Sequence, residues 1–196
     1  NMPEFTVWHV DRKMGTRGRH RAEVTCTDCR VSADALFSGA GGVGFKTAMK
    51  VLDRGRIHIG AVCVATAERL IDDSLRYAME RQQFGQPIAA FQLIQAMLAD
   101  SRAEAYAARC MVEETARRRD SGLPVVTEAS CCKLFCAEMV GRVADRAVQI
   151  HGGAGYMAEY GIERFYRDVR LFRIYEGTSQ IQQLVIARNM MREAGE

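Results

Sequence analysis

Three long segments with a helical apolar period, each ended by glycine or proline, most constrain how this chain can fold. They span residues 45–81, 89–119 and 126–150. Apolar side chains recur in each segment at the spacing that places them on one side of a helix. Gly85 and Pro87 separate the first two segments, and Gly152 with Gly153 ends the third. Long helices with such short connections pack antiparallel, which predicts a helical bundle.

Shorter elements flank the three long helices. Helical patterns return over residues 159–170 and 179–192. Near the start, two runs rich in β-branched and aromatic residues, Phe5–Val10 and Ala22–Cys26, predict strands. Two or three strands make no stable sheet without a partner surface, so we expect this segment to be the end of something larger.

Composition excludes several classes of protein. With 196 residues and 48% hydrophobic content, the chain can bury a full core. No apolar run approaches the ~20 residues that cross a bilayer, and no secretory leader opens the chain, so we expect neither a membrane protein nor a secreted one. A net charge of +3 is small for a protein that binds nucleic acid.

The seven cysteines are an odd number without the spacing of a disulfide framework, which favours free thiols in a reducing compartment. His20, Cys26 and Cys29 have a metal-like spacing. A structural zinc site needs a second close pair of ligands and none follows, so we predict no metal. Three further cysteines lie in a helical pattern and are expected to pack as small apolar residues, namely Cys131, Cys132 and Cys136.

One run of arginines could present a basic face to phosphates. The four residues fall at three-residue spacing and are Arg164, Arg167, Arg170 and Arg173. Because Glu163 and Asp168 lie among them, a solvated or salt-bridged helix face is the better interpretation, and we expect no binding to nucleic acid.

The segment from Tyr175 to Gln182 sets one carboxylate, Glu176, on a glycine turn directly ahead of a helix. Thr178 or Ser179 can accept from the first free helix N–H groups, and Gln182 follows Ser179 at the spacing of a capping box, so the helix starts at about Ser179. Burial beside Tyr175 would favour the neutral acid, whereas the positive helix end would favour the carboxylate. Glu176 is therefore a candidate base, and the alternative is an ordinary acid near a helix start.

Two other segments carry groups that suit a ligand. Residues 81–85 end the first long helix with a cation, two amides, an aromatic ring and a turn, which could bind a phosphate-bearing ligand with a ring or form an ordinary helix end. Residues 149–156 are rich in glycine but follow a helix, so they lack the context of a dinucleotide motif. They predict either a helix cap and turn or a close backbone approach to a flat ligand.

Together these segments resemble the C-terminal half of the acyl-CoA dehydrogenase family. The matches occur in the family's order and separations, cover essentially the whole chain, and comprise Leu52 to Arg56, Arg81 to Gly85, Phe91-Gln92, Gln149 to Tyr156, Arg167-Asp168 and Ile174 to Gln182. The resemblance implies a mainly α fold, a C-terminal four-helix bundle preceded by a few β strands. Residues 1–40 would be the remnant of the family's middle β domain, and residues 41–196 the helical bundle domain.

The resemblance also implies a reaction. An FAD-dependent oxidoreductase would convert an acyl-CoA thioester to a trans-2-enoyl-CoA, as in fatty acid β-oxidation, with Glu176 as the base that removes the α proton. Electrons would pass to an electron-transfer flavoprotein. The backbone N–H at position 176 and a flavin hydroxyl would polarise the thioester oxygen. Some branches of the family carry the base at the position of Gly55 instead, which here cannot ionise.

The family's contacts carry over to named positions. FAD contacts are expected from Arg81, Gln83, Phe84, Phe91, Gln92, Gln149, Ile150, His151, Gly152, Gly153, Thr178 and Gln180. Most of the positions before Thr178 would serve the FAD of a neighbouring subunit, with Arg81 on its pyrophosphate. The acyl-CoA site would be lined by Asp53 to Arg56, Tyr175 and Gly177. These contacts imply a homo-oligomer, a dimer at least and by resemblance a tetramer built as a dimer of dimers.

Length is the main departure from the family, whose members are roughly twice as long. The absent part carries an N-terminal helical domain and the strands that hold the flavin ring, so we expect the isolated chain to be inactive. A non-catalytic helical oligomerisation module is the alternative. The expected compartment is a bacterial cytoplasm or the mitochondrial matrix.

Overall fold

The computed structural model describes residues 4–36 and 42–195 and divides into two compact units, Asn1–Val51 and Leu52–Glu196. The long first helix begins in one unit and continues into the other. Our predicted domain boundary, between residues 40 and 41, lies outside the described residues. It therefore stays a prediction.

The first unit contains the two predicted strands. Strand β1 (Phe5–Val10) pairs antiparallel with β2 (Ala22–Cys26), with Phe5 opposite Cys26 and a shift of register between Val7 and Val10. A short 3-10 helix, η1 (Ala33–Ala35), follows. The side chains of β1 are all exposed, Trp8 at 64%. The pair exposes apolar side chains on both strands, and the expectation that this segment is the end of something larger stays a prediction.

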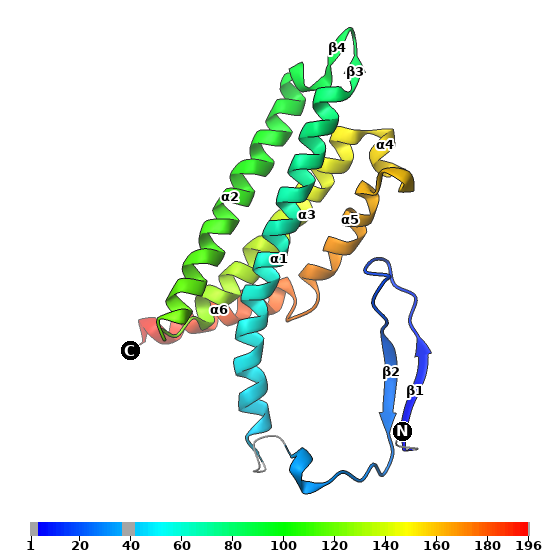
Figure 1. The fold of residues 1–196 in the computed structure, drawn as a ribbon. Helices are drawn as coiled ribbons and strands as arrows, with labels where there is room; N and C mark the ends of the chain where they lie inside the picture. The colour runs from blue at the N-terminus through cyan, green and yellow to red at the C-terminus, as the bar shows by residue number, and fades with distance from the viewer. Residues whose placement is uncertain (1–3, 37–41, 196) are drawn as a thin grey trace. The chain divides into compact units, whose positions relative to one another are not determined.

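The second unit is the helical bundle, which confirms the predicted mainly α fold (Figure 1). Its long helices are α2 (Gln92–Asp120), α3 (Val126–His151) and the part of α1 (Gly44–Glu80) that follows Val51. The shorter α5 (Ile162–Val169) lies beside α3 as the fourth member, whereas α6 (Ser179–Ala194) crosses α3 at one end. Because α3 contacts α2, α5 and α6, it is the central helix of the unit.

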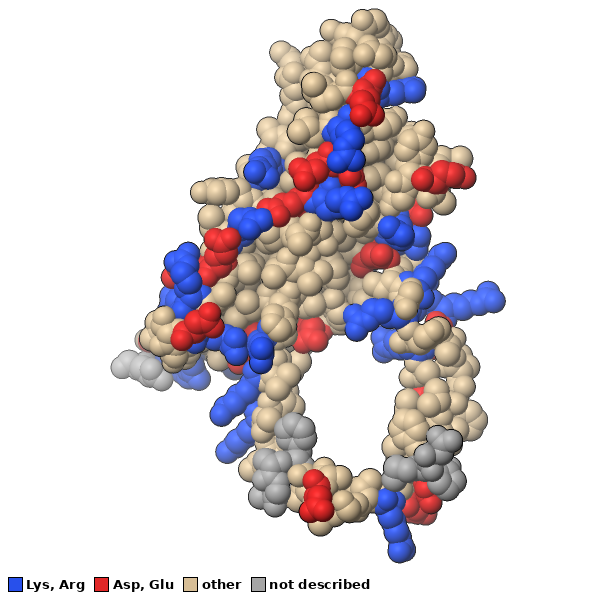
Figure 2. Space-filling model, in the orientation of Figure 1, with Lys and Arg blue, Asp and Glu red and all other residues tan. Residues whose placement is uncertain are grey.

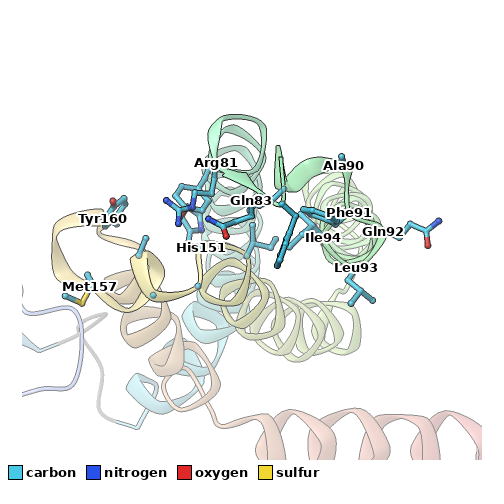
Figure 3. A pocket seen from close by; sticks show the side chains of 17 residues that line it. Arg81, Gln83, Ala90, Phe91, Gln92, Leu93, Ile94, His151, Met157 and Tyr160 are labelled. Atoms are coloured by element: carbon cyan, nitrogen blue, oxygen red, sulfur yellow. The ribbon is translucent and has the colours of Figure 1, made fainter. Parts of the chain in front are cut away.

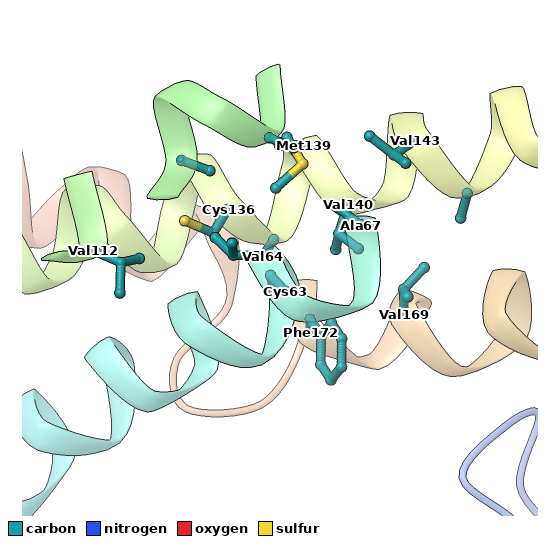
Figure 4. Packing of buried hydrophobic residues seen from close by; sticks show 14 of the residues in the cluster. Cys63, Val64, Ala67, Val112, Cys136, Met139, Val140, Val143, Val169 and Phe172 are labelled. Atoms are coloured by element: carbon teal, nitrogen blue, oxygen red, sulfur yellow. The ribbon is translucent and has the colours of Figure 1, made fainter. Parts of the chain in front are cut away.

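Small side chains build much of the core and let the helices approach closely (Figure 4). A Cβ atom at Gly60 of α1 would lie 2.9 Å from a methyl group of Val112 in α2. Cys132 and Cys136 are buried among the apolar residues, as predicted, whereas Cys131 is only partly buried. All seven cysteines are free thiols. The core residues labelled in the figure are Cys63, Val64, Ala67, Val112, Cys136, Met139, Val140, Val143, Val169 and Phe172.

The first connection of the bundle is a small hairpin that the sequence analysis did not predict. Strands β3 (Gln82–Gln83) and β4 (Gln86–Pro87) pair across Phe84 and Gly85, whose φ angles are 51° and 81°. Two left-handed residues in succession match the twist of a tight hairpin. A 3-10 turn, η3 (Ile88–Ala90), follows, so the predicted helix from residue 89 is wrong at its start and α2 begins at Gln92.

The segment after α3 also differs from the sequence prediction. Helix α3 ends at His151, but the chain makes another helical turn, α4 (Gly153–Tyr156), and a 3-10 turn, η4 (Ala158–Tyr160). Gly161, with a φ of 73°, reverses the chain, so α5 starts at Ile162 instead of the predicted Glu159. A 3-10 turn, η5 (Arg170–Arg173), then prolongs α5.

The surface mixes both signs of charge (Figure 2). In the predicted arginine run, Arg167 pairs with Glu163 at 2.6 Å and Arg173 pairs with Glu138 at 3.1 Å. These pairs support the salt-bridged interpretation over a phosphate-binding face. Across residues 4–36 and 42–195, none of the helices has the length and apolar character needed to span a membrane.

Candidate functional site

The site is built on a left-handed turn between η5 and α6. Glu176 has a φ of 56° and Gly177 a φ of 85°. A residue with a Cβ atom in this region costs about 1–3 kcal/mol and persists only where its surroundings fix it. Glu176 is partly buried, so the strained residue carries its carboxylate at the edge of the bundle instead of in open solvent.

Two fully buried side chains hold the carbonyl groups of this turn. The Gln182 amide donates to the Glu176 carbonyl at 3.0 Å and to the Gly177 carbonyl at 3.1 Å. The Lys133 ammonium, which comes from α3, donates to the same Gly177 carbonyl at 2.6 Å. The backbone is therefore tied both to the helix that follows it and to the central helix of the bundle.

The start of α6 differs from the predicted capping box. Thr178 is the N-cap, and its hydroxyl accepts from the Ile181 N–H at 3.3 Å. Ser179 instead donates to the Glu138 carboxylate on α3 at 2.7 Å. The Gln182 side chain is used on the turn, so the predicted pairing of Ser179 with Gln182 is wrong, although the predicted helix start at Ser179 is confirmed.

The Glu176 carboxylate lies against the backbone of α1 at Gly55. A Cβ atom at position 55 would lie 2.6 Å from Glu176 Oε2 and 3.3 Å from Cδ. Real Cβ atoms do not approach oxygen so closely, so the carboxylate keeps this position only because residue 55 is glycine. Two sequence positions that the family resemblance connected are thus brought together.

Charged groups surround the turn on its inner side. Arg56 is 8% exposed and pairs with Asp53 at 2.8 Å, while the same Nη1 atom lies 3.4 Å from the Ser130 hydroxyl. Burial lowers the pKa of the Lys133 ammonium, and nearby acidic groups, Glu176 among them, oppose that decrease. The guanidinium of Arg56 thus faces the bundle interior, and its predicted contact with substrate stays a prediction.

Two features of the neighbouring backbone bear on chemistry at the carboxylate. The Tyr175 ring stacks on Phe172 at 5.8 Å between centroids, which anchors the chain just before the turn. Within the described part of the chain, the Glu176 N–H has no hydrogen-bond partner. This amide is therefore available to donate to a ligand oxygen.

A second set of predicted residues lines a pocket of about 1180 Å³ at the other end of α1 (Figure 3). Its walls come from the end of α1, the β3–β4 hairpin, the start of α2 and the end of α3. Nine of the twelve predicted FAD contacts line it, namely Arg81, Gln83, Phe84, Phe91, Gln92, Ile150, His151, Gly152 and Gly153. Gln149, Thr178 and Gln180 do not.

Aromatic rings give the pocket its shape. Tyr77 stacks on His151 at 4.3 Å and meets Tyr160 edge-on at 6.4 Å. His151 Nδ1 lies 2.8 Å from the Ala147 carbonyl, so Nδ1 carries the proton, and burial lowers the pKa of the ring. His151 is thus a neutral ring in the wall of the pocket.

The rim of the pocket holds one strained, exposed ring. Phe84 is 90% exposed in a left-handed conformation, and its ring meets that of Phe91 edge-on at 6.0 Å. Arg81, Gln83 and His151 line the same pocket, and in Figure 3 the Gln92 side chain extends away from them. No acid pairs with Arg81 among the residues that the structure describes. An exposed ring and a cation in the walls of one pocket suit a ligand that carries rings and phosphate.

The two sets of predicted residues do not converge on one site within the chain. Gly55 lies within α1, and Arg81 follows the last residue of that helix, 26 positions later. At 1.5 Å per residue, this separation corresponds to a rise of roughly 39 Å. Thr178 and Gln180 belong to the end with Glu176, whereas the pocket belongs to the other. A single ligand held by the pocket therefore does not reach the carboxylate of the same chain.

Several residues of these sites were not predicted from the sequence. Lys133 lies on the buried face of α3 between Cys132 and Cys136, and a lone cation in an apolar stripe was an available signal. Glu138 and Tyr77 gave no such signal, because their partners lie far along the chain. Among the described residues, no group of three or more His, Cys, Asp or Glu could hold a metal ion.

Comparison with known proteins gives consistent matches. The family model described as "Acyl-CoA dehydrogenase, C-terminal domain" matches residues 42–191. The chain is 48% identical over 97% of its length to the probable acyl-CoA dehydrogenase YngJ of Bacillus subtilis, covering 50% of that protein. It is 39% identical over 93% of its length to the caffeyl-CoA reductase-Etf complex subunit CarC of Acetobacterium woodii, covering 48% of it.

A solved structure agrees with these sequence matches. The butyryl-CoA dehydrogenase of Megasphaera elsdenii superposes with a TM-score of 0.93 at 36% identity, over 97% of this chain and 49% of that one. The chain spans about half the length of the curated relatives it matches.

Replacing Gln182 tests how strongly the turn depends on its buried amide. Gln182→Leu removes both hydrogen bonds and leaves the Glu176 carbonyl without its donor, so we expect the free energy of unfolding in urea to fall by about 1–3 kcal/mol. The adjacent Gln183 is exposed, and Gln183→Leu should change stability by less than about 0.5 kcal/mol. Equal effects of the two substitutions would contradict this role.

Proposed function

Because the chain belongs to the acyl-CoA dehydrogenase family, as its C-terminal domain, we propose that it supplies the catalytic base of an FAD-dependent dehydrogenation of an acyl-CoA thioester. The observation that carries this proposal is the Glu176 carboxylate, set by a strained turn against Gly55. Both groups lie on the side of the bundle where the resemblance expects the acyl chain. The product would be a trans-2-enoyl-CoA.

The chemistry divides between two adjacent carbon atoms. The Glu176 carboxylate takes the α hydrogen as a proton, and its own backbone N–H donates to the thioester oxygen, which accepts the negative charge that develops. FAD, when bound, supplies the two-electron acceptor for the β hydrogen, which leaves as hydride. The C–C single bond becomes a double bond, and the two electrons then pass to an electron-transfer flavoprotein.

The distant pocket fits the nucleotide part of FAD. Its aromatic walls suit flat rings, Arg81 is free to meet a pyrophosphate, and a Cβ atom at Gly152 or Gly153 would meet open space. Because the pocket lies roughly 39 Å along α1 from Gly55, it would hold the FAD of a neighbouring copy. This supports a homo-oligomer, which by resemblance is a dimer of dimers.

A second candidate function is the reverse reaction, reduction of an enoyl-CoA. The match to CarC, named as a caffeyl-CoA reductase, favours it, and the same name supports an electron-transfer flavoprotein as partner. In this direction the protonated Glu176 would return a proton to the α carbon. Free thiols agree with the proposed location in a bacterial cytoplasm or mitochondrial matrix.

Flavin absorbance tests the function directly. The product of the complete reading frame that encodes this chain should purify with FAD, and its flavin absorbance should fall when a saturated acyl-CoA is added without oxygen. The reductase would be favoured if the flavin bleaches only when a reduced partner protein is added and an enoyl-CoA then restores the flavin absorbance. Absence of both flavin and bleaching would contradict the proposal and favour a non-catalytic oligomerisation module. The isolated chain should not bleach.

The substitution Gly55→Ala should displace the Glu176 carboxylate without lowering the stability of the fold. Alanine favours a helix over glycine by up to about 1 kcal/mol, so the free energy of unfolding should hold or rise. The new methyl group would displace Glu176 Oε2, and we expect the bleaching rate to fall by about 100-fold.

Gly44→Ala is the matched control for this substitution. It lies at the start of the same helix, and a Cβ atom there would meet nothing within 4 Å. Its bleaching rate should equal that of the wild type. A folded Gly55→Ala protein that bleaches at the wild-type rate would contradict the role of Glu176.

A further inference from the structure

Lys133 is a lysine at a position built for an apolar side chain. It is 0% exposed on α3, and Cys132, Cys136 and Ala137 beside it belong to the hydrophobic core. Burying an ammonium costs several kcal/mol unless hydrogen bonds and opposite charges offset the loss of water. The local contacts of Lys133 therefore determine why a cation can occupy this place.

Within the part of the chain that the structure describes, this ammonium makes one hydrogen bond. It donates that bond to the turn formed by Glu176 and Gly177. Nζ donates to the Gly177 carbonyl at 2.6 Å, across 44 positions of sequence. A short bond from a charged donor is about twice as strong as a neutral one. Gln182 donates to the same oxygen at 3.1 Å, so this carbonyl is held from two helices.

The Gly177 carbonyl is a point from which the turn can be fixed. On the other side of Glu176, the Tyr175 ring is stacked on Phe172 and packed against the core. With the chain anchored on both sides, the left-handed conformations at Glu176 and Gly177 cannot relax, and the carboxylate stays against Gly55. Loss of one anchor would let the strained residues return to more favourable angles.

We propose that Lys133 is a positioning residue for Glu176: its buried ammonium holds the Gly177 carbonyl and so fixes the turn that presents the carboxylate to substrate. The inference rests on the proposed role of Glu176 as base. It assigns Lys133 no contact with substrate or flavin.

The charges around Lys133 add a second consequence. The titratable groups that face it are Arg56 and Cys63 on α1, Glu138 on α3 and Glu176 on the turn. The ammonium and Arg56 are the cations of this set. Lys133→Met would therefore remove a positive charge from beside Glu176 as well as the donor to the turn.

The test uses the complete protein and three substitutions. Lys133→Met removes the donor and the charge, Lys133→Arg retains both, and Arg142→Met removes a charge from the exposed face of the same helix, where Arg142 pairs with Glu104. Flavin content, kcat and KM are measured for each. If Lys133→Met does not fold, the shorter and polar Lys133→Gln takes its place.

For Lys133→Met we expect kcat to fall by about 10–100-fold with KM and flavin content unchanged, because a slightly displaced base reacts slowly. Lys133→Arg should recover most of the rate, and Arg142→Met should match the wild type throughout.

Two results would overturn the inference. One is a Lys133→Met protein with wild-type kcat, and the other is an equal loss in Arg142→Met. A failure of the proposed function appears differently, as a wild-type protein that acyl-CoA does not bleach or a Gly55→Ala protein with full activity. If Gly55→Ala loses activity while Lys133→Met does not, Glu176 remains the base and only the role of Lys133 is wrong.

Discussion

The left-handed turn at Glu176 and Gly177 is the constraint on which the proposed site depends, because a glutamate does not hold such a conformation unaided. Its two carbonyl groups receive hydrogen bonds from fully buried side chains on α6 and α3. The central helix of the bundle, α3, thus helps to support a strained backbone turn. Strain of this kind marks functional sites, and here it is coupled to one particular carboxylate.

The length of the bundle explains why one chain can carry two sets of candidate ligand-binding groups that do not contact the same bound ligand. Helix α1 runs past Gly55 at one end and leads to Arg81 at the other, and its length keeps the base and the aromatic pocket apart. In the proposed homo-oligomer, the pocket of one copy would complete the site of another. Oligomerisation would then be part of the site's construction and not only a source of stability.

Sequence patterns predicted the parts of this structure that depend on local or periodic signals. The three long helices followed from apolar spacing, and the start of α6 followed from a polar residue ahead of a helical run. The hairpin at Phe84 was missed because two-residue strands have no period, and the extra turn α4 because glycines at 152 and 153 normally end a helix. The roles of Lys133 and Glu138 depend on contacts across more than 40 positions, which spacing along the chain does not encode.

The most direct measurement of the central claim is anaerobic flavin bleaching by Glu176→Gln in the complete protein. Glutamine keeps the size of the side chain but cannot accept the α proton, so FAD should remain bound while the bleaching rate falls by at least about 100-fold. Glu114→Gln, which removes an exposed acid from α2, should bleach like the wild type. Bleaching of the Glu176→Gln protein within a few-fold of the wild-type rate, with full flavin content, would contradict the account.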